Sequence, residues 1–566
     1  MRIHLPASVL CLLLSSSLAS AQTDEFPFEL AAGKEPAKKE PAKKEPGTKD
    51  KKTEAADKGK LPLTKLAPGK LRPEMCLLRY NVTTRSPICQ AYFDQGLGFL
   101  YSYVWMEAAR SFEMATRHDP DCAMAWWGLS RAIEKWGRGQ HTDALKKAQE
   151  LMGKASHAES LLIKARLQEK GLWAGVGPES RRKEATKTID ELLTLHEDDE
   201  EGWFYRAQLA EGAYANIPYY KALLRINPLH PGANHELVHI YENTRRPALG
   251  WKHAEGYIQS SPGQWHAFHM QAHLAMRIGK WEKTADRSAH AIELERAYHA
   301  DLDVKPNEDW QFSHHLETLL TSLTHDGRFE EARKIKKVCQ DNKFEHPIVF
   351  FRLHLAERDF DAALAVANGF GKRKDKTTAS YLRALVYLKK GETERAAPEV
   401  AVLQEAYAGK RTDKQLELRL WETQGQLLCQ KGDVEAGLKL LAKTVAKTKD
   451  DYGAHAWGHG ADFMEVWGVA ALKSNKLDVA EEAFLESLAH DTHSVRGALG
   501  MSVVCERLGR TEESLRFAEL AQRCWKKADP GCIQAELSDL RAPMSTAGGG
   551  KGRPSFFDGP PEKKKK

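Results

Sequence analysis

The sequence has little that would indicate a β-fold, a membrane protein or a thiol enzyme. Alternating polar and apolar runs are rare, so a β-sheet is not expected. After the first twenty or so residues, no segment is long and apolar enough to span a bilayer. The cysteines that follow Cys11 are scattered without a CxxC pair, so no thiol chemistry is expected.

The central part of the chain also has no excess charge. The formal net charge of +6 comes from residues 34–60, with ten lysines and six acids, and from residues 551–566, with six basic and two acidic residues. Residues 61–550 have a net charge of zero. A neutral body argues against a nucleic-acid-binding face. The basic ends could contact anionic envelope polymers, although solvated tails are the simpler interpretation.

Both ends of the chain have the composition of processing or linker segments. Residues 1–21 combine an arginine, an apolar run and an Ala-Ser-Ala ending, which predicts a signal peptide cut before Gln22. The protein should therefore be exported, to the periplasm or beyond the cell. Residues 22–70 are rich in Lys, Glu, Pro and Ala and predict a disordered tether, and residues 542–566 predict a disordered basic tail.

Export permits disulfide bonds. Cys76 with Cys89, and Cys524 with Cys532, are the pairs close enough in sequence to bridge. The other cysteines fall in helical patterns and are expected to be small buried core residues. They are Cys122, Cys339, Cys429 and Cys505.

From Ala91 onward the hydrophobic pattern has a helical period. The stretch from Gln95 to Gly128 spaces small residues, one phenylalanine and one proline as a pair of closely packed antiparallel helices would need. These residues are Gly96, Ala108, Phe112, Ala115 and Pro120. The stretch resembles the tetratricopeptide repeat (TPR) family. The resemblance implies an all-α fold, a right-handed superhelix (α-solenoid) of about ten to twelve helix pairs over residues 85–541.

Histidines are concentrated between residues 230 and 317. His235 and His239 are four residues apart, with Glu242 three further on, so they share one helical face. His269 and His273 repeat this spacing 34 residues later, and 34 residues is the length of one TPR helix pair. Two successive repeats should therefore present matching imidazole pairs from neighbouring helices.

The TPR frame, which the resemblance supplies, places these side chains on the concave groove where TPR proteins bind ligands. The groove set from the first two repeats is His230, His235, His239, Glu242, His266, His269 and His273. The next repeat adds His314 and Glu317, and Trp127 could be an apolar anchor in the same groove.

Imidazole is the commonest protein ligand for Zn, Cu and Fe, so this set predicts a transition-metal site. An i, i+4 pair on a rigid helix can hold two nitrogens about 2.0–2.1 Å from one ion, and the neighbouring helix would add two more. We expect the imidazoles of His235, His239, His269 and His273 to converge within about 4–5 Å around one ion. The alternative is a histidine-rich groove that hydrogen-bonds locally or binds an acidic peptide.

The segment His235–His239 also reads HELVH, which matches the HExxH signature of zinc peptidases with Glu236 as general base. The motif is short, and a peptidase of this class needs a third ligand and an adjacent sheet. Glu255 is available, but the TPR frame places it away from the groove. A peptidase is therefore the least favoured function.

Further motifs resemble a group of exported bacterial TPR proteins with histidine-rich repeats. They are FDQGL (Phe93–Leu97), DPDCAMAWWG (Asp119–Gly128), His235/His239/Glu242 and His266/His269/Met270/His273. The resemblance covers most of residues 85–345. This chain departs from the group at Gln271, where proline is usual, and at Val104-Trp105, where Asn-His would add one ligand. The group usually lacks a glutamate at the place of Glu236.

Together these features predict an exported scaffold that binds a protein or peptide in its groove and carries a Cu, Zn or Fe site. A metal-dependent oxidase or hydrolase on the same scaffold is the alternative.

Overall fold

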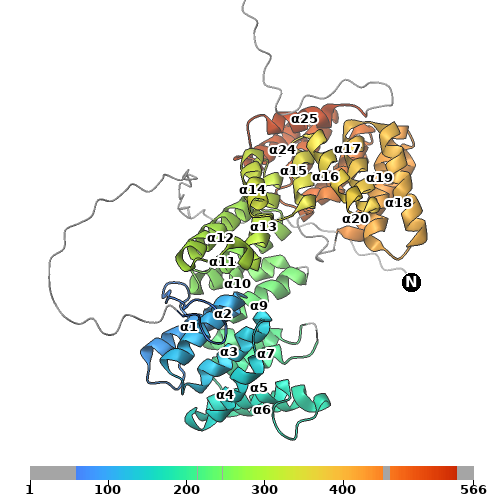
Figure 1. Ribbon diagram of the computed structural model, residues 1–566. Helices are drawn as coiled ribbons and strands as arrows, with labels where there is room; N and C mark the ends of the chain where they lie inside the picture. The colour runs from blue at the N-terminus through green and yellow to red at the C-terminus, as the bar shows by residue number, and fades with distance from the viewer. Residues whose placement is uncertain (1–58, 213, 245, 450–458, 545–566) are drawn as a thin grey trace, which may run out of the picture. The chain divides into compact units, whose positions relative to one another are not determined.

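A computed structural model describes residues 59–212, 214–244, 246–449 and 459–544 (Figure 1). Over these ranges the chain forms 25 α-helices and no β-strand, which confirms the all-α prediction. The described helices include none that is long and apolar enough to cross a membrane. The predicted signal peptide, the tether up to residue 58 and the basic tail from residue 545 lie outside the described residues.

The first thirteen helices end with the one that completes the histidine region. They are α1 (Pro87–Tyr101), α2 (Trp105–His118), α3 (Ala123–Trp136), α4 (His141–Glu150), α5 (His157–Lys170), α6 (Arg181–Leu195), α7 (Glu200–Gln208), α8 (Ile217–Ile226), α9 (Pro231–Asn243), α10 (Pro247–Ser260), α11 (Trp265–Arg277), α12 (Trp281–Leu302) and α13 (Trp310–His325).

The remaining helices continue the same alternation of helix and short turn. They are α14 (Phe329–Asp341), α15 (Pro347–Ala356), α16 (Phe360–Lys372), α17 (Lys376–Lys390), α18 (Thr393–Gly409), α19 (Lys414–Lys431), α20 (Val434–Thr448), α21 (Asp462–Lys473), α22 (Leu477–His490), α23 (Val495–Arg507), α24 (Thr511–Cys524) and α25 (Cys532–Arg541). Three short 3₁₀ turns occur at Met152–Lys154, Pro178–Ser180 and Pro306–Glu308.

Helices pack in the order in which they follow one another along the chain. From α1 to α24 each helix contacts the next, and alternate helices such as α1 with α3, α9 with α11 and α23 with α25 also touch. Contacts with the next helix and the next but one are those of stacked helical hairpins, in which each repeat buries its apolar face on its neighbours. Figure 1 shows this succession over α9 to α14.

The close packing of the hairpins depends on glycines that face phenylalanine rings. Phe112 of α2 is fully buried between Gly96 of α1 and Gly128 of α3. A Cβ atom at Gly128 would lie 2.4 Å from the Phe112 ring. Phe484 of α22 packs in the same way between Gly468 and Gly500. The small-residue positions read from the sequence therefore have the expected packing role.

Glycine also ends two helices of the later repeats. Gly391 follows α17 with φ 76°, and Gly432 follows α19 with φ 97°. Their N–H groups donate to carbonyls of the last helical turn. Glycine is favoured there because other residues rarely adopt positive φ.

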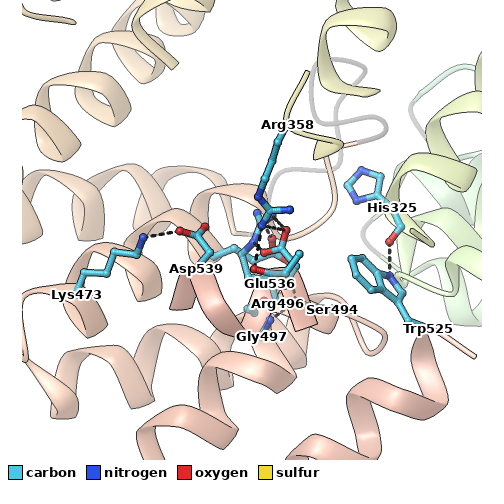
Figure 2. Close-up of polar contacts among 12 residues, drawn as sticks. His325, Arg358, Lys473, Ser494, Arg496, Gly497, Trp525, Glu536 and Asp539 are labelled. Carbon is cyan, nitrogen blue, oxygen red and sulfur yellow. Dashed lines mark hydrogen bonds and ion pairs between the residues drawn. The ribbon is translucent and has the colours of Figure 1, made fainter. Parts of the chain in front are cut away.

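The last helix is joined to earlier repeats by polar contacts (Figure 2). Glu536 of α25 accepts hydrogen bonds from Arg358 at 3.1 Å and from Arg496 of α23 at 3.2 Å. Nearby, the Trp525 indole N–H donates to the His325 carbonyl at 2.8 Å. The carboxylate of Glu536 is buried, and these two guanidinium partners offset the cost of removing its charge from water.

Residues 59–86 differ from the predicted tether, which was expected to run to residue 70. Leu61 is fully buried, and the backbone N–H groups of Leu63 and Thr64 donate to the Glu113 carboxylate at 2.6 and 2.8 Å. The Lys- and Pro-rich composition conceals these few apolar residues, which anchor the segment on α2.

The eight cysteines in the described part of the chain are free and buried, so neither close pair forms a disulfide. Cys76 lies against the Ser261 hydroxyl at 3.4 Å, and Cys532 against the Gly327 carbonyl at 3.7 Å. Each member of a close pair packs in its own environment, so proximity in sequence was a poor guide.

The glycine–phenylalanine packing leads to a stability prediction. The Gly128→Ala variant should lose about 1–3 kcal/mol of unfolding free energy, because its methyl group would overlap the Phe112 ring. The Gly153→Ala variant is the matched control, since no atom lies within 4 Å of the added Cβ, and it should change stability by less than about 0.5 kcal/mol. Urea unfolding followed by circular dichroism measures both; equal effects would contradict the packing argument.

Candidate metal centre

Three helices contribute the histidines of the candidate site. They are α9 with His235 and His239, α11 with His266, His269 and His273, and α13 with His314 and His315. Helical spacing of three or four residues places the imidazoles of α9, and likewise those of α11, on one face, whereas His314 and His315 of α13 are adjacent in sequence. These faces meet, as the 34-residue recurrence predicts for α9 and α11.

The first group of imidazoles, here called the first triad, consists of His235, His239 and His266. One ring nitrogen from each lies within 4.8 Å of those of the other two. The Nε2 atoms of His235 and His266 are 3.1 Å apart. Two nitrogens bound tetrahedrally to one ion would be separated by about 3.3 Å, given metal–nitrogen bonds of about 2.0–2.1 Å.

The orientation of His235 is fixed by a backbone acceptor. Its Nδ1–H donates to the Tyr101 carbonyl at 2.5 Å. Since a carbonyl only accepts, the proton of the neutral ring is on Nδ1 and the lone pair is on Nε2, which faces His266. A second hydrogen-bond partner of this kind is typical of metal-ligating histidines.

The second group, the second triad, consists of His269, His273 and His314, whose ligand nitrogens also lie within 4.8 Å of one another. The Nε2 atoms of His273 and His314 are 3.3 Å apart. Glu242 of α9 accepts from Nδ1 of His273 at 3.2 Å and from Arg277 at 3.1 Å. The carboxylate therefore holds the His273 ring with Nε2 toward His314, as an orienting carboxylate does in metal sites.

The predicted four-histidine centre is wrong in one respect. His269 and His273 group with His314 of α13, whereas His235 and His239 group with His266 of α11. The reason is position along α11: His266 lies one turn before His269 and faces α9, and the nearest rings of the two triads, His266 and His269, have centroids 5.6 Å apart. Glu317 lies beside His314, 3.7 Å from its Nδ1.

Sequence reasoning missed His315. Its Nδ1 donates to Glu295 of α12 at 2.8 Å, and both side chains are fully buried. Its ring packs on His269 with a centroid distance of 4.1 Å. His315 is out of phase with the 34-residue recurrence, and its partner Glu295 lies on α12, which carries none of the predicted site residues. Only the adjacent His314-His315 pair would have indicated it.

Several imidazole nitrogens in the site are buried without a hydrogen-bond partner among the described residues. They are Nε2 of His239, Nδ1 of His266, Nδ1 of His269 and Nε2 of His315. Leaving such a group unpaired costs about 1–3 kcal/mol each, so natural proteins rarely retain several together. Of these four atoms, Nε2 of His239 and Nδ1 of His269 belong to residues of the triads, and their lone pairs would be available to bound transition-metal ions. His266 faces His235 with its Nε2 atom instead, and His315 belongs to neither triad. The residues present therefore fit a metal.

Burial also keeps the imidazoles neutral. Desolvation, with repulsion from neighbouring imidazoles, lowers the pKa of His235, His266 and His269 well below 6.5. Desolvation lowers the pKa of His239 to about 4. At neutral pH these rings therefore carry lone pairs rather than charge, which is the form that binds metal.

Two residues predicted for the groove have structural roles instead. His230 precedes α9, where its Nδ1 accepts from the Ala233 N–H at 3.1 Å, and it belongs to neither triad. Trp127 is fully buried, and the Arg131 guanidinium lies 4.4 Å from its ring centroid. It is therefore a core residue and presents no surface to a ligand.

The peptidase hypothesis loses support. The Glu236 carboxylate accepts from the Tyr103 hydroxyl at 2.9 Å, and no strand adjoins α9 in the described chain. Glu255 accepts from the Trp251 indole at an exposed position, away from the triads, as the repeat frame predicts. The residue that joins the two histidines of the HExxH motif as a third possible ligand is His266, not Glu255.

A third set of ligand types, His354, Glu357 and Asp359, is a weaker candidate. His354 Nδ1 lies 2.9 Å from Glu357, and the Lys336 ammonium lies 2.5 Å from His354 Nε2. The Lys336 ammonium group already lies where a cation would sit and would repel a metal ion, so this set does not belong to the candidate metal centre.

Titration of His230 gives a prediction independent of metal. Burial lowers its pKa from 6.5 to about 3, so the unfolded chain binds a proton there more readily than the folded one. The contribution of His230 to the free energy of unfolding is fully present above pH 6.5 and decreases as the pH falls. Between pH 8 and pH 5 the decrease is about 2 kcal/mol. The His230→Asn variant keeps a capping acceptor and should lose that share of the pH dependence. Urea unfolding of the metal-free proteins at both pH values measures it; identical pH dependence would contradict the assignment.

A protein-family comparison identifies the repeat in two parts of the chain. The tetratricopeptide repeat family model matches residues 93–159 and 349–411. No curated protein matches the chain. One solved structure that matches is the human IFIT1 dimer with m7Gppp-AAAA, at 14% sequence identity and a TM-score of 0.27, covering 79% of this chain and 91% of that one. Another is yeast Tom70, at 13% sequence identity and a TM-score of 0.31, covering 80% of this chain and 88% of that one. The resemblance of the histidine motifs to exported bacterial proteins stays a prediction. The chain is thus an all-α protein that contains tetratricopeptide repeats.

Proposed function

We propose that this protein binds a transition-metal ion through the histidines of α9, α11 and α13. The observation that carries the proposal is the grouping of imidazoles into two sets, each with ligand nitrogens within 4.8 Å of one another. The buried nitrogens without partners and the orienting acceptors Tyr101 and Glu242 support it.

The ligand set narrows the choice of metal. Both triads consist of imidazoles alone, and the carboxylates of Glu242 and Glu295 act on histidines as hydrogen-bond acceptors. Magnesium and calcium prefer oxygen ligands, whereas imidazole suits Cu, Zn and Fe. We therefore expect Cu, Zn or Fe.

Elemental analysis of the purified full-length protein tests the proposal. The wild-type protein should retain at least one Cu, Zn or Fe ion per chain after dialysis, and the His235→Ala/His269→Ala double variant should retain less than about a tenth as much, since each triad would lose a ligand. His290→Ala on α12 lies outside both triads and is the matched control.

Circular dichroism should show that the double variant remains helical. Wild-type protein without metal, or a double variant with unchanged metal content, would contradict the proposal. The histidines would then be hydrogen-bonding groups of a peptide-binding groove.

We also propose that the repeats bind a protein or peptide partner outside the cytoplasm. Stacked repeats create extended concave binding surfaces. The basic segments 34–60 and 551–566 could hold such a protein near anionic envelope polymers through charge.

Export has a direct test. Mass spectrometry of the protein from its native host should find a mature chain that begins at Gln22, because Ala19 and Ala21 supply the small residues that signal peptidase needs. The Ala21→Asp variant should remain uncut. A cytoplasmic chain that still carries residues 1–21 would contradict export.

A metal-dependent oxidase or hydrolase is the second candidate, and one observation favours it. A cavity of about 300 Å³ is lined in part by Tyr101, Tyr103, Phe204 and Glu236. The Tyr103 ring lies 4.5 Å from that of His235 and stacks on His239 at 5.7 Å. A small molecule in the cavity would thus be separated from the first triad by one side chain.

A further inference from the structure

We propose that the centre holds two metal ions, one in each triad, and that each ion keeps an open coordination position. This inference rests on the proposed metal binding and specifies its stoichiometry. It differs from a single ion shared by all the histidines.

The number of ligands supports two ions. A transition ion in such a site takes about four ligands, and a site with three protein ligands leaves one position for water or another small molecule. The triads supply six imidazoles, and His315 adds a seventh, more than one ion can bind. Each triad alone meets the three-ligand requirement.

The distances separate the two sets. Ligand nitrogens lie within 4.8 Å of one another inside each triad, and each of the six histidines belongs to one such group. The shortest nitrogen pairs, at 3.1 Å between His235 and His266 and at 3.3 Å between His273 and His314, also fall within triads. Both match the spacing of about 3.3 Å around one tetrahedral ion.

Each triad also has its own orienting group. The Tyr101 carbonyl fixes His235 in the first triad, and the Glu242 carboxylate fixes His273 in the second. Glu242 is itself held by Arg277 at 3.1 Å, and its carboxylate also lies 3.9 Å from Nδ1 of His239 in the first triad. Each triad thus has one ring oriented by a hydrogen-bond acceptor, and Glu242 lies between the two triads.

The surroundings of the open positions differ. The Tyr103 ring lies within 4.5 to 5.9 Å of all three rings of the first triad, measured between centroids. It therefore covers the first triad on the side of the 300 Å³ cavity. In the second triad His273 and His314 are less buried than His269. We infer that a small exogenous ligand reaches the second ion more readily than the first.

Cobalt(II) is a suitable probe because its visible absorption reports coordination number. The metal-free full-length protein, titrated with cobalt(II) alone, should bind two equivalents, measured by absorption and by elemental analysis after gel filtration. His239→Ala in the first triad and His314→Ala in the second should each bind one equivalent, and the pair of substitutions none. His290→Ala should still bind two.

The open positions have a separate readout. Azide should shift the absorption of the cobalt in His239→Ala, where only the second triad is intact, at lower concentration than in His314→Ala. A variant that fails to retain its helical circular dichroism would be replaced by the corresponding His→Gln variant, which cannot supply imidazole.

The outcomes distinguish the two proposals. Two equivalents that are lost one at a time support two sites. One equivalent in the wild-type protein, abolished by either substitution, overturns this inference and leaves metal binding intact. No bound cobalt, copper, zinc or iron overturns both. Absence of any azide effect with two bound ions would overturn the open positions.

Discussion

The burial of neutral imidazoles between α9, α11 and α13 is the constraint that shapes this region. Desolvation keeps His235, His266 and His269 unprotonated, and several of their neighbours' nitrogens are left without hydrogen-bond partners. An apolar core would avoid both costs, as the packing of the Phe112 and Phe484 rings against glycines does. Metal binding would offset the free-energy cost of the unpaired lone pairs.

The supports of the site come from helices both near to it and far from it in sequence. The Tyr101 carbonyl ends α1 and holds a histidine of α9, while Glu295 of α12 holds His315 of α13. The second contact joins consecutive helices of the stack, whereas the first depends on the direct contact of α1 with α9. In both cases rigid helices rather than loops place the ligands. Placement on helices limits the positional error of each nitrogen, which a metal site requires.

The sequence was sufficient for the repeat and for the face of each helix, because both follow from spacing. The recurrence of His235 and His239 at His269 and His273 predicted imidazoles on neighbouring helices, and these residues lie on α9 and α11, which contact each other. It could not predict the division into two triads, since this depends on which turn of α11 opposes α9 and which opposes α13. His315 has no periodic counterpart, and its carboxylate partner lies in a stretch whose composition resembles a loop. For Trp127 and His230 the repeat frame predicted positions in the groove. In the structure Trp127 is a core residue and His230 caps the start of α9.

The turn between α1 and α2 contains a strained residue, Tyr103, whose ring packs against the first triad. Tyr103 has φ 59°, a conformation that costs a residue with a side chain about 1–3 kcal/mol. The turn is held by His235, which donates to Tyr101, and by Gln311 of α13, which donates to the Ser102 carbonyl at 3.1 Å. These bonds place the Tyr103 ring against the first triad, within 4.5 to 5.9 Å of its three imidazole rings. Tyr103 also lines the cavity of about 300 Å³, so its ring lies between the cavity and the first triad. The strained turn thereby determines which side chain covers the first triad.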